Sequence, residues 1–418
     1  MGLIIFSLLL YLFTLLRGSN KDFFQPEIFL NIYFIILIGL GPIALYFYSE
    51  NMYLSGNYQN VIQMVLIGYV CINLGYFLAS KQTRNVFTNK TYLSPPGGYS
   101  SSFKSKLRIS AYVFFTIGIL ASLLFFARTG NIPILAANKE AARVAALAVG
   151  GNGYVLYLMS MGMYGVALYA IYAYGYNKDK TQLFLLFAIM GLAMTGTGSR
   201  RYILWVCLYL LIAKHYLSSP IPKTRMLVYT FLGLLFVNLF EMFRNPDSMT
   251  TTSLSTTFSY RFIIYISNLE KVLTYFMSRD EYEYGGTFFM DILTALPGKQ
   301  IDYQSWLKKV TNLEFEGFGI PPTLMGDLYV NFGYVGVVLG CTLFGFMVRN
   351  IYNSLILKRG SFYNLFLYMA VLEISSKIIT SGISAQAISI LWLAIFVGLY
   401  KVLFKHLALF GGYRNAIN

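Results

Sequence analysis

The sequence is poor in charge, in histidine and in cysteine. Charged residues make up 12% of its 418 residues, whereas globular domains usually carry about 25%. Its three cysteines, Cys71, Cys207 and Cys341, lie inside apolar runs, and their spacing suggests neither pairing nor metal ligation. These shortages exclude a soluble enzyme, and we expect no metal and no cofactor.

Apolar residues are abundant instead. They form 57% of the chain, and the mean hydropathy is +0.59. They fall in runs that approach or reach the length needed to cross a bilayer, which predicts an all-α polytopic membrane protein, a single transmembrane domain over residues 1–418 with about eleven helices. The predicted spans are 3–16, 28–48, 61–79, 109–127, 154–174, 183–195, 202–213, 226–242, 328–348, 365–379 and 388–404.

Cations outnumber anions, with 32 Lys and Arg against 17 Asp and Glu, for a net charge of +15. Most of the cations fall in alternate loops, among them Arg84, Lys104 and Arg349. Since cytoplasmic loops of membrane proteins are enriched in Lys and Arg, this bias predicts an outward amino terminus and an inward carboxyl terminus rather than a nucleic-acid partner.

Two long segments then face outward, residues 128–153 and residues 244–327. Loops longer than about 12 to 15 residues are usually functional or disordered. The first is predicted to hold a short helix over 139–149, capped by Asn138 and ended by Gly150 and Gly151. In the second, helical spacing predicts an amphipathic helix on the membrane surface, within a folded cap. That spacing joins Phe262, Ile266, Leu269, Leu273 and Phe276.

A group of arginines lies on the outward side or at its membrane boundary, where the loop bias does not place cations. Guanidinium groups match phosphate oxygens in a bidentate manner, so several together would form a pyrophosphate cradle. The alternative is that each extends separately to lipid headgroups. The group comprises Arg128, Arg143, Arg200, Arg201, Arg244 and Arg261.

Arg200 and Arg201 end a glycine-rich stretch, residues 195–201, between two short predicted spans. Such a stretch can line a cavity at membrane depth, and a helix that starts near Ser199 would aim its amides at an anion. A tight helical hairpin with interfacial arginines is the alternative. The absence of a Gly-Lys-Ser/Thr motif and of a preceding strand excludes nucleotide binding.

Acid and base candidates must be outward carboxylates, because both histidines, His215 and His406, fall on the cytoplasmic side. Asp327 opens a predicted span, where it can cap the helix or act as a general base. Glu241 lies three residues before Arg244, so an ion pair and a catalytic role are both open.

Four stretches together resemble the Wzy-type polymerases that join the repeat units of bacterial O antigens and capsules. One departure is that Asp327 stands where many members of that family have glutamate. The stretches are Gly130-Asn131-Ile132-Pro133 with Arg143 and Gly150-Gly151-Asn152-Gly153; Thr197-Gly198-Ser199-Arg200; Tyr284-Gly285-Gly286-Thr287 with Leu296-Pro297; and Gly326-Asp327-Leu328-Tyr329-Val330-Asn331-Phe332-Gly333-Tyr334-Val335-Gly336.

The resemblance implies the architecture of O-antigen polymerases and ligases and a metal-independent glycosyltransferase at the outer face of the bacterial cytoplasmic membrane. Undecaprenyl-pyrophosphate-linked glycans would be donor and acceptor, and a chain-length regulator and a flippase are possible partners beside membrane lipids. Asp327 or Glu241 would accept the hydroxyl proton. Pyrophosphate and glycan would be held by Arg143, Arg200, Arg201, Arg244, Arg261, Tyr329 and Asn331.

Other classes of protein compete with this interpretation. An O-antigen ligase shares the donor, but the outward histidine expected in that family is absent. A polysaccharide flippase or another transporter would often show internal repeats, and none is visible. A non-catalytic assembly partner of the same pathway also fits the sequence.

Overall fold

The structure is a computed structural model that describes residues 2–17, 22–48, 58–81, 101–244, 254–279, 281–296, 301–313, 319–358 and 361–414. Within these ranges all regular structure is helical. Eight helices are long and apolar enough to cross a membrane. The predicted all-α polytopic membrane fold is therefore confirmed. Every predicted span lies in a helical segment, but α1 (Gly2–Arg17), α8 (Lys180–Gly196) and α9 (Arg201–Leu217) are short, so the number of crossings stays a prediction.

Residue contacts divide the chain into two compact units. Unit 1 comprises Met1–Thr88, Thr252–Arg359 and Ala370–Leu391. Its elements are α1 (Gly2–Arg17), α2 (Pro26–Phe34), η1 (Ile35–Gly39), α3 (Gly41–Tyr48), α4 (Tyr58–Lys81), α11 (Leu254–Arg279), η5 (Gly286–Phe289), α12 (Met290–Leu293), α13 (Tyr303–Val310), α14 (Thr323–Tyr352), η6 (Asn353–Lys358), η7 (Ser384–Gln386), the second part of α15 (Phe362–Ser381) and the start of α16 (Ala387–Arg414).

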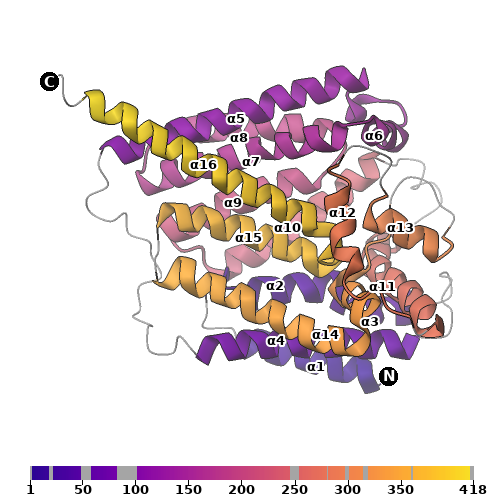
Figure 1. The fold of residues 1–418 in the computed structure, drawn as a ribbon. Helices are drawn as coiled ribbons and strands as arrows, with labels where there is room; N and C mark the ends of the chain where they lie inside the picture. The colour runs from indigo at the N-terminus through magenta and orange to yellow at the C-terminus, as the bar shows by residue number, and fades with distance from the viewer. Residues whose placement is uncertain are drawn as a thin grey trace. The chain divides into compact units, whose positions relative to one another are not determined.

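Helices α4 and α14 run side by side in unit 1 (Figure 1). Small residues permit this close approach, as in many membrane helix pairs. A Cβ atom added at Gly345 would collide with the carbonyl oxygen of Ile72, and one added at Gly75 would collide with that of Thr342. The two backbones are therefore in direct contact, and side chains cannot yield to relieve a clash.

Gly345→Ala should lower the stability of the protein by about 1 to 3 kcal/mol, because the two helices must separate to admit the methyl group. The midpoint of thermal unfolding of the purified protein measures this. Gly233→Ala is the matched control, since a Cβ there meets no atom within 4 Å. Equal midpoints for the two variants would contradict the backbone contact.

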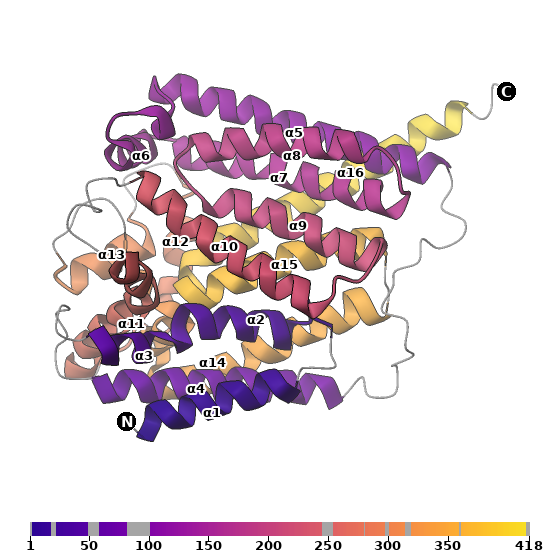
Figure 2. The ribbon, with the colours of Figure 1, turned by 180° about the vertical axis from the view of Figure 1, so that it is seen from behind.

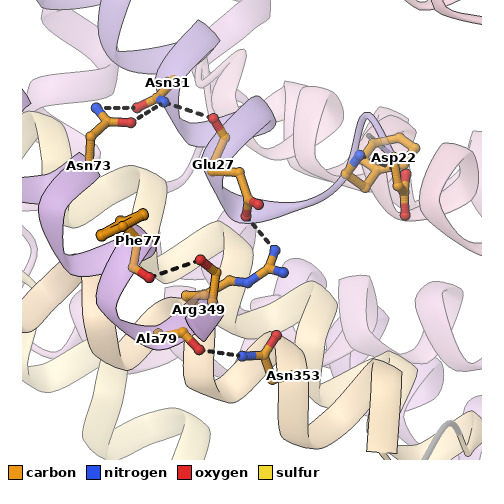
Figure 3. Close-up of polar contacts among 10 residues, drawn as sticks. Asp22, Glu27, Asn31, Asn73, Phe77, Ala79, Arg349 and Asn353 are labelled. Carbon is orange, nitrogen blue, oxygen red and sulfur yellow. Dashed lines mark hydrogen bonds and ion pairs between the residues drawn. The ribbon is translucent and has the colours of Figure 1, made fainter. Parts of the chain in front are cut away.

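A buried ion pair joins α2 to α14 inside unit 1. Figure 3 shows the Arg349 guanidinium bonded to the Glu27 carboxylate, with Asn353 donating to the carbonyl oxygen of Ala79 nearby. Arg349 is 2% exposed. The sequence counted it among the loop cations, but it lies within α14, and its side of the membrane stays a prediction. Removing either charge would leave the other buried and unpaired, a strongly destabilising change.

The amphipathic helix predicted within residues 244–327 is α11. We name residues 244–327 the outer segment after their predicted side of the membrane. Ile266, Leu269 and Leu273 are buried, as is Phe276. The helix packs against α3, η1 and α14. The apolar stripe is thus covered by protein rather than open to lipid, and the position of α11 relative to the membrane stays a prediction.

Unit 2 comprises Asn89–Thr251, Gly360–Met369 and Trp392–Asn418. Helices α5 (Ser101–Thr129) and α7 (Asn152–Gly175) pack along each other, and α8 and α9 contact α7 (Figure 2). Short helix α6 lies at the end of this layer (Figure 2). The core is aromatic, since Tyr164 contacts Phe366 and Phe396. Its elements are α5 (Ser101–Thr129), η3 (Pro133–Leu135), α6 (Lys139–Ala148), α7 (Asn152–Gly175), α8 (Lys180–Gly196), α9 (Arg201–Leu217), α10 (Lys223–Arg244) and the remaining parts of α15 and α16.

Candidate functional site

Two of the predicted arginines contact one carboxylate in unit 2, and the charge of a third acts on it. Arg143 donates through Nε to Oε2 of Glu140 at 3.1 Å and through Nη2 to Oε1, which makes a bidentate pair. Nε of Arg244 lies 3.0 Å from the same Oε2. The charge of Arg200 also acts on Glu140. We name Glu140, Arg143, Arg200 and Arg244 the arginine cluster.

Local structure fixes the position of this cluster. The side chain of Asn138 accepts from the amide of Ala141 at 3.0 Å, so α6 begins as predicted and presents Glu140 and Arg143 on adjacent turns. The stem of Arg143 lies across Gly198, where a Cβ would be 3.3 Å from its Cδ. Two of the stretches that carry the family resemblance, around Arg143 and around Gly198, thus meet here.

The electrostatics of Glu140 reflect an excess of positive charge. Burial raises the pKa of its carboxyl, but the hydrogen bond and charge of Arg143 and the charges of Arg244 and Arg200 outweigh burial, so the pKa is lowered. The carboxylate is ionised at neutral pH and offsets only one of three positive charges. Such a site retains attraction for a second anion.

The other predicted residues have different positions. Arg128 in the last turn of α5 donates to the carbonyl oxygen of Gly150. Arg201 is exposed, with its guanidinium 5.6 Å from the centre of the Tyr202 ring. The side chains of Arg261 and Glu241 lie outside the described residues, and Arg261 belongs to unit 1. Arg244, predicted to pair with Glu241, forms an ion pair with Glu140.

The other two resembling stretches meet in unit 1, at a break in α14. Gly333 has φ +62° and ψ −154°, a conformation that glycine adopts readily. The break leaves carbonyl groups of α14 open to other donors. Val330 and Asn331 accept from the amides of Glu283 and Tyr284, each at 3.0 Å. The outer segment that follows α11 is therefore bonded directly to α14.

Asp327 is fully buried, and its carboxylate holds the turn between α15 and η7. Oδ2 accepts from the amides of Ile383 at 2.6 Å and Ser384 at 3.0 Å, and Oδ1 accepts from the Ser384 hydroxyl at 2.6 Å. Gly382 has φ +87°, and a Cβ there would be 2.6 Å from that of Asp327. The prediction that Asp327 caps its own helix is wrong, because α14 begins at Thr323. Asp327 caps the start of η7 instead.

Asn331 and Tyr329 were expected to contact substrate, but both are buried. Asn331 accepts from the Gly285 amide at 3.0 Å, and its Nδ2 donates to Oγ1 of Thr287 at 2.7 Å. Thr287 and Ser384 share a hydrogen bond of 2.8 Å. In this structure Asn331 holds the outer segment in place, and its side chain does not reach the surface.

A second buried carboxylate, Asp291, lies in the outer segment. Its Oδ1 accepts from the amide of Tyr303 at 2.8 Å. Burial raises the pKa of Asp291 to about 6; the Tyr303 amide lowers it in part, and the charges of Asp302 and Asp327 raise it. Burial together with Asp327 and Asp291 also holds the pKa of the Tyr303 hydroxyl well above its usual value.

This raised pKa predicts a pH-dependent stability. An unfolded aspartate titrates near pH 3.9, so the folded protein binds the proton more tightly. Stability from this group is complete below about pH 4 and falls as pH rises through about 6, by at most about 3 kcal/mol. Asp291→Asn keeps an acceptor for the Tyr303 amide and should flatten the dependence of the unfolding midpoint between about pH 4 and 6.5. An unchanged slope in the variant would refute this assignment.

Glu27 and Asp291 escaped the sequence analysis, and so did three further charged residues that form ion pairs. Glu140 is one, although it stands three residues before Arg143 on a predicted helix. The others are Glu373 and Lys377, which pair within α15. The available signal was that Glu373 and Lys377 have opposite charges and lie four residues apart inside an apolar span. Charges at membrane depth are usually paired or functional.

Fold and site together define a multi-pass helical membrane protein with a cationic cluster at the ends of its helices. A family model described as "Putative O-antigen polymerase" matches residues 22–393. The chain belongs to this family, which implies lipid-linked glycan substrates and a polymerase of the glycosyltransferase kind in polysaccharide biosynthesis. Searches of curated proteins and of solved structures found no match.

Proposed function

We propose that this protein polymerises undecaprenyl-pyrophosphate-linked repeat units at the outer face of the bacterial cytoplasmic membrane, and that the arginine cluster holds the pyrophosphate. The observation that carries the proposal is the contact of Arg143 and Arg244 with Glu140, on which the charge of Arg200 also acts. Phosphate oxygens accept from guanidinium groups in the same bidentate geometry as a carboxylate. The groups that hold Glu140 are thus suited to a diphosphate.

The proposed reaction transfers the growing glycan. A hydroxyl of a new lipid-linked repeat attacks C1 of the sugar at the chain end, the bond from C1 to the pyrophosphate oxygen breaks, and the lipid pyrophosphate leaves with the electron pair. Arginines stabilise the developing negative charge, so no metal is needed for that task. Arg201, in the same unit as the cluster, remains proposed as a further contact to the pyrophosphate.

The hydroxyl proton goes to a carboxylate, and Asp327 and Glu241 are the candidates. Both oxygens of Asp327 already accept hydrogen bonds in a fully buried position. To act as the base, Asp327 would have to lose its bonds to the turn at Ile383 and Ser384. A positioning role needs no such movement, and we favour it.

Purified protein in liposomes, given only the lipid-linked repeat and EDTA, tests the proposal. A polymerase produces a ladder of glycan lengths from that substrate alone. A ligase would produce no ladder without a lipid A core acceptor, and a flippase would move the lipid without forming a glycosidic bond. A ladder that needs an added divalent cation would refute the metal-independent mechanism.

A further inference from the structure

Four tyrosines form a continuous row in unit 1 where the outer segment meets the break in α14. The rings of Tyr284 and Tyr282 are 6.4 Å apart at 89°, those of Tyr282 and Tyr329 are 6.0 Å apart at 85°, and those of Tyr329 and Tyr334 are 5.3 Å apart at 83°. These are edge-to-face contacts. The ends are open, since Tyr284 is 79% exposed and Tyr334 is 42% exposed. We name these residues the tyrosine row.

The backbone holds the tyrosine row rigidly. Tyr284 has φ +46°, which is uncommon for a residue other than glycine. Its amide donates to the carbonyl oxygen of Asn331, and the next amide, of Gly285, donates to Oδ1 of Asn331. The ring of Tyr282 fits over Gly333, where a Cβ would be 2.8 Å from it. The most exposed ring of the row thus stands on a strained and anchored backbone, which core packing does not explain.

The length of α14 and η6 indicates where the row lies relative to the bilayer. The candidate span Thr323–Ile356 has 34 residues, whereas about 20 residues suffice to cross the hydrocarbon layer. The part after Gly333 is by itself long enough for the crossing. A crossing that begins at the break would place Tyr334 and Tyr284 near the boundary, at the level of the first sugars of a lipid-linked glycan.

The negative charge beside the tyrosine row favours sugars over anionic ligands. Glu281 and Glu283 are exposed on either side of Tyr282. Their negative charge disfavours anionic lipid headgroups and a diphosphate, whereas carboxylates accept hydrogen bonds from sugar hydroxyls. The open tyrosine rings match the apolar face of a pyranose ring. We propose that the tyrosine row, with Glu281 and Glu283, binds sugar rings of the lipid-linked glycan. This inference rests on the proposed function and adds a glycan subsite to it.

Binding of two lipids to the full-length protein in nanodiscs tests the subsite. The probes are undecaprenyl pyrophosphate that carries the repeat unit, extracted from source cells that lack the polymerase, and bare undecaprenyl pyrophosphate. The wild type should bind the glycan-bearing lipid more tightly. Tyr284→Ala should weaken that binding roughly fivefold and leave the bare lipid unaffected. Tyr284→Phe, which keeps the ring, should behave as the wild type.

Tyr229→Ala is the matched control, because Tyr229 is an exposed tyrosine on α10 in the other unit. A Tyr284→Ala protein that keeps the full preference for the glycan-bearing lipid overturns the subsite. Equal weakening for both lipids also overturns it, since the row would then contact the lipid itself. If the wild type binds neither lipid, the proposed function fails and the subsite fails with it.

Discussion

Arg244→Ala should abolish polymer in cells while the protein remains at its normal level in the membrane. A well-placed donor to a developing negative charge contributes about 3 to 4 kcal/mol, so its loss reduces the rate by about a hundredfold to a thousandfold. Arg143→Ala and Arg200→Ala should have effects of similar size. Arg143→Lys should restore little polymer, because lysine keeps the charge but cannot make the bidentate contact. Gel analysis of the polymer, with immunoblotting of the protein, measures both quantities.

Two further substitutions make this test specific. Arg225→Ala removes an exposed arginine at the opposite end of α10 and should leave polymer unchanged. Glu140→Gln separates phosphate binding from a merely structural ion pair. If the arginines served only to pair with Glu140, this variant would be as inactive as Arg244→Ala. If they bind pyrophosphate, the variant should still make polymer, since the positive charge is retained. Normal polymer in the Arg143, Arg200 and Arg244 variants would refute the pyrophosphate site.

Sequence reasoning located the helices because a bilayer imposes a length and a polarity on each of them. It also selected Arg143, Arg200 and Arg244 from the loop charge bias, and in the structure Arg143 and Arg244 contact one carboxylate on which the charge of Arg200 also acts. Their partner Glu140 was missed although it stands three residues before Arg143, and its contact with Arg244 joins α6 to the end of α10, about a hundred positions away in the sequence. A sequence pattern reports neighbours along a helix, so Arg244 was assigned to the nearby Glu241.

The same limit applies in unit 1. The stripe of Ile266, Leu269 and Leu273 predicts an apolar face, but either lipid or protein can cover such a face. The contacts of α11 with α3 and α14 show that protein covers it. The role of Asp327 depends on Gly382 and Ser384, which lie more than fifty residues further along the chain. Charge and hydropathy thus identified candidate residues, whereas their hydrogen-bond partners could be identified only from the three-dimensional structure.

Asp327→Asn should lower both the stability of the protein and its polymer yield. The carboxylate accepts three close hydrogen bonds, from the amides of Ile383 and Ser384 and from the Ser384 hydroxyl. In asparagine the amide nitrogen takes the place of one oxygen, so the Ser384 hydroxyl must turn to accept from it and the remaining hydrogen bonds lose their charged acceptor. Hydrogen bonds to charged groups contribute about 1.5 to 3 kcal/mol, whereas neutral ones contribute about 0.5 to 1.5 kcal/mol.

A loss of stability together with polymer yield distinguishes a positioning role of Asp327 from a role in proton transfer. A residue that only accepts a proton would lose activity on this substitution and keep its stability. Ser384→Ala removes one of the donors and leaves the carboxylate intact, so under the positioning role it should cause the same two losses on a smaller scale. Thermal unfolding of the purified proteins and polymer ladders from the matching cells provide the comparison. If Asp327→Asn unfolds at the wild-type temperature and makes no polymer, Asp327 is the base, and the turn at Gly382 must open during the reaction.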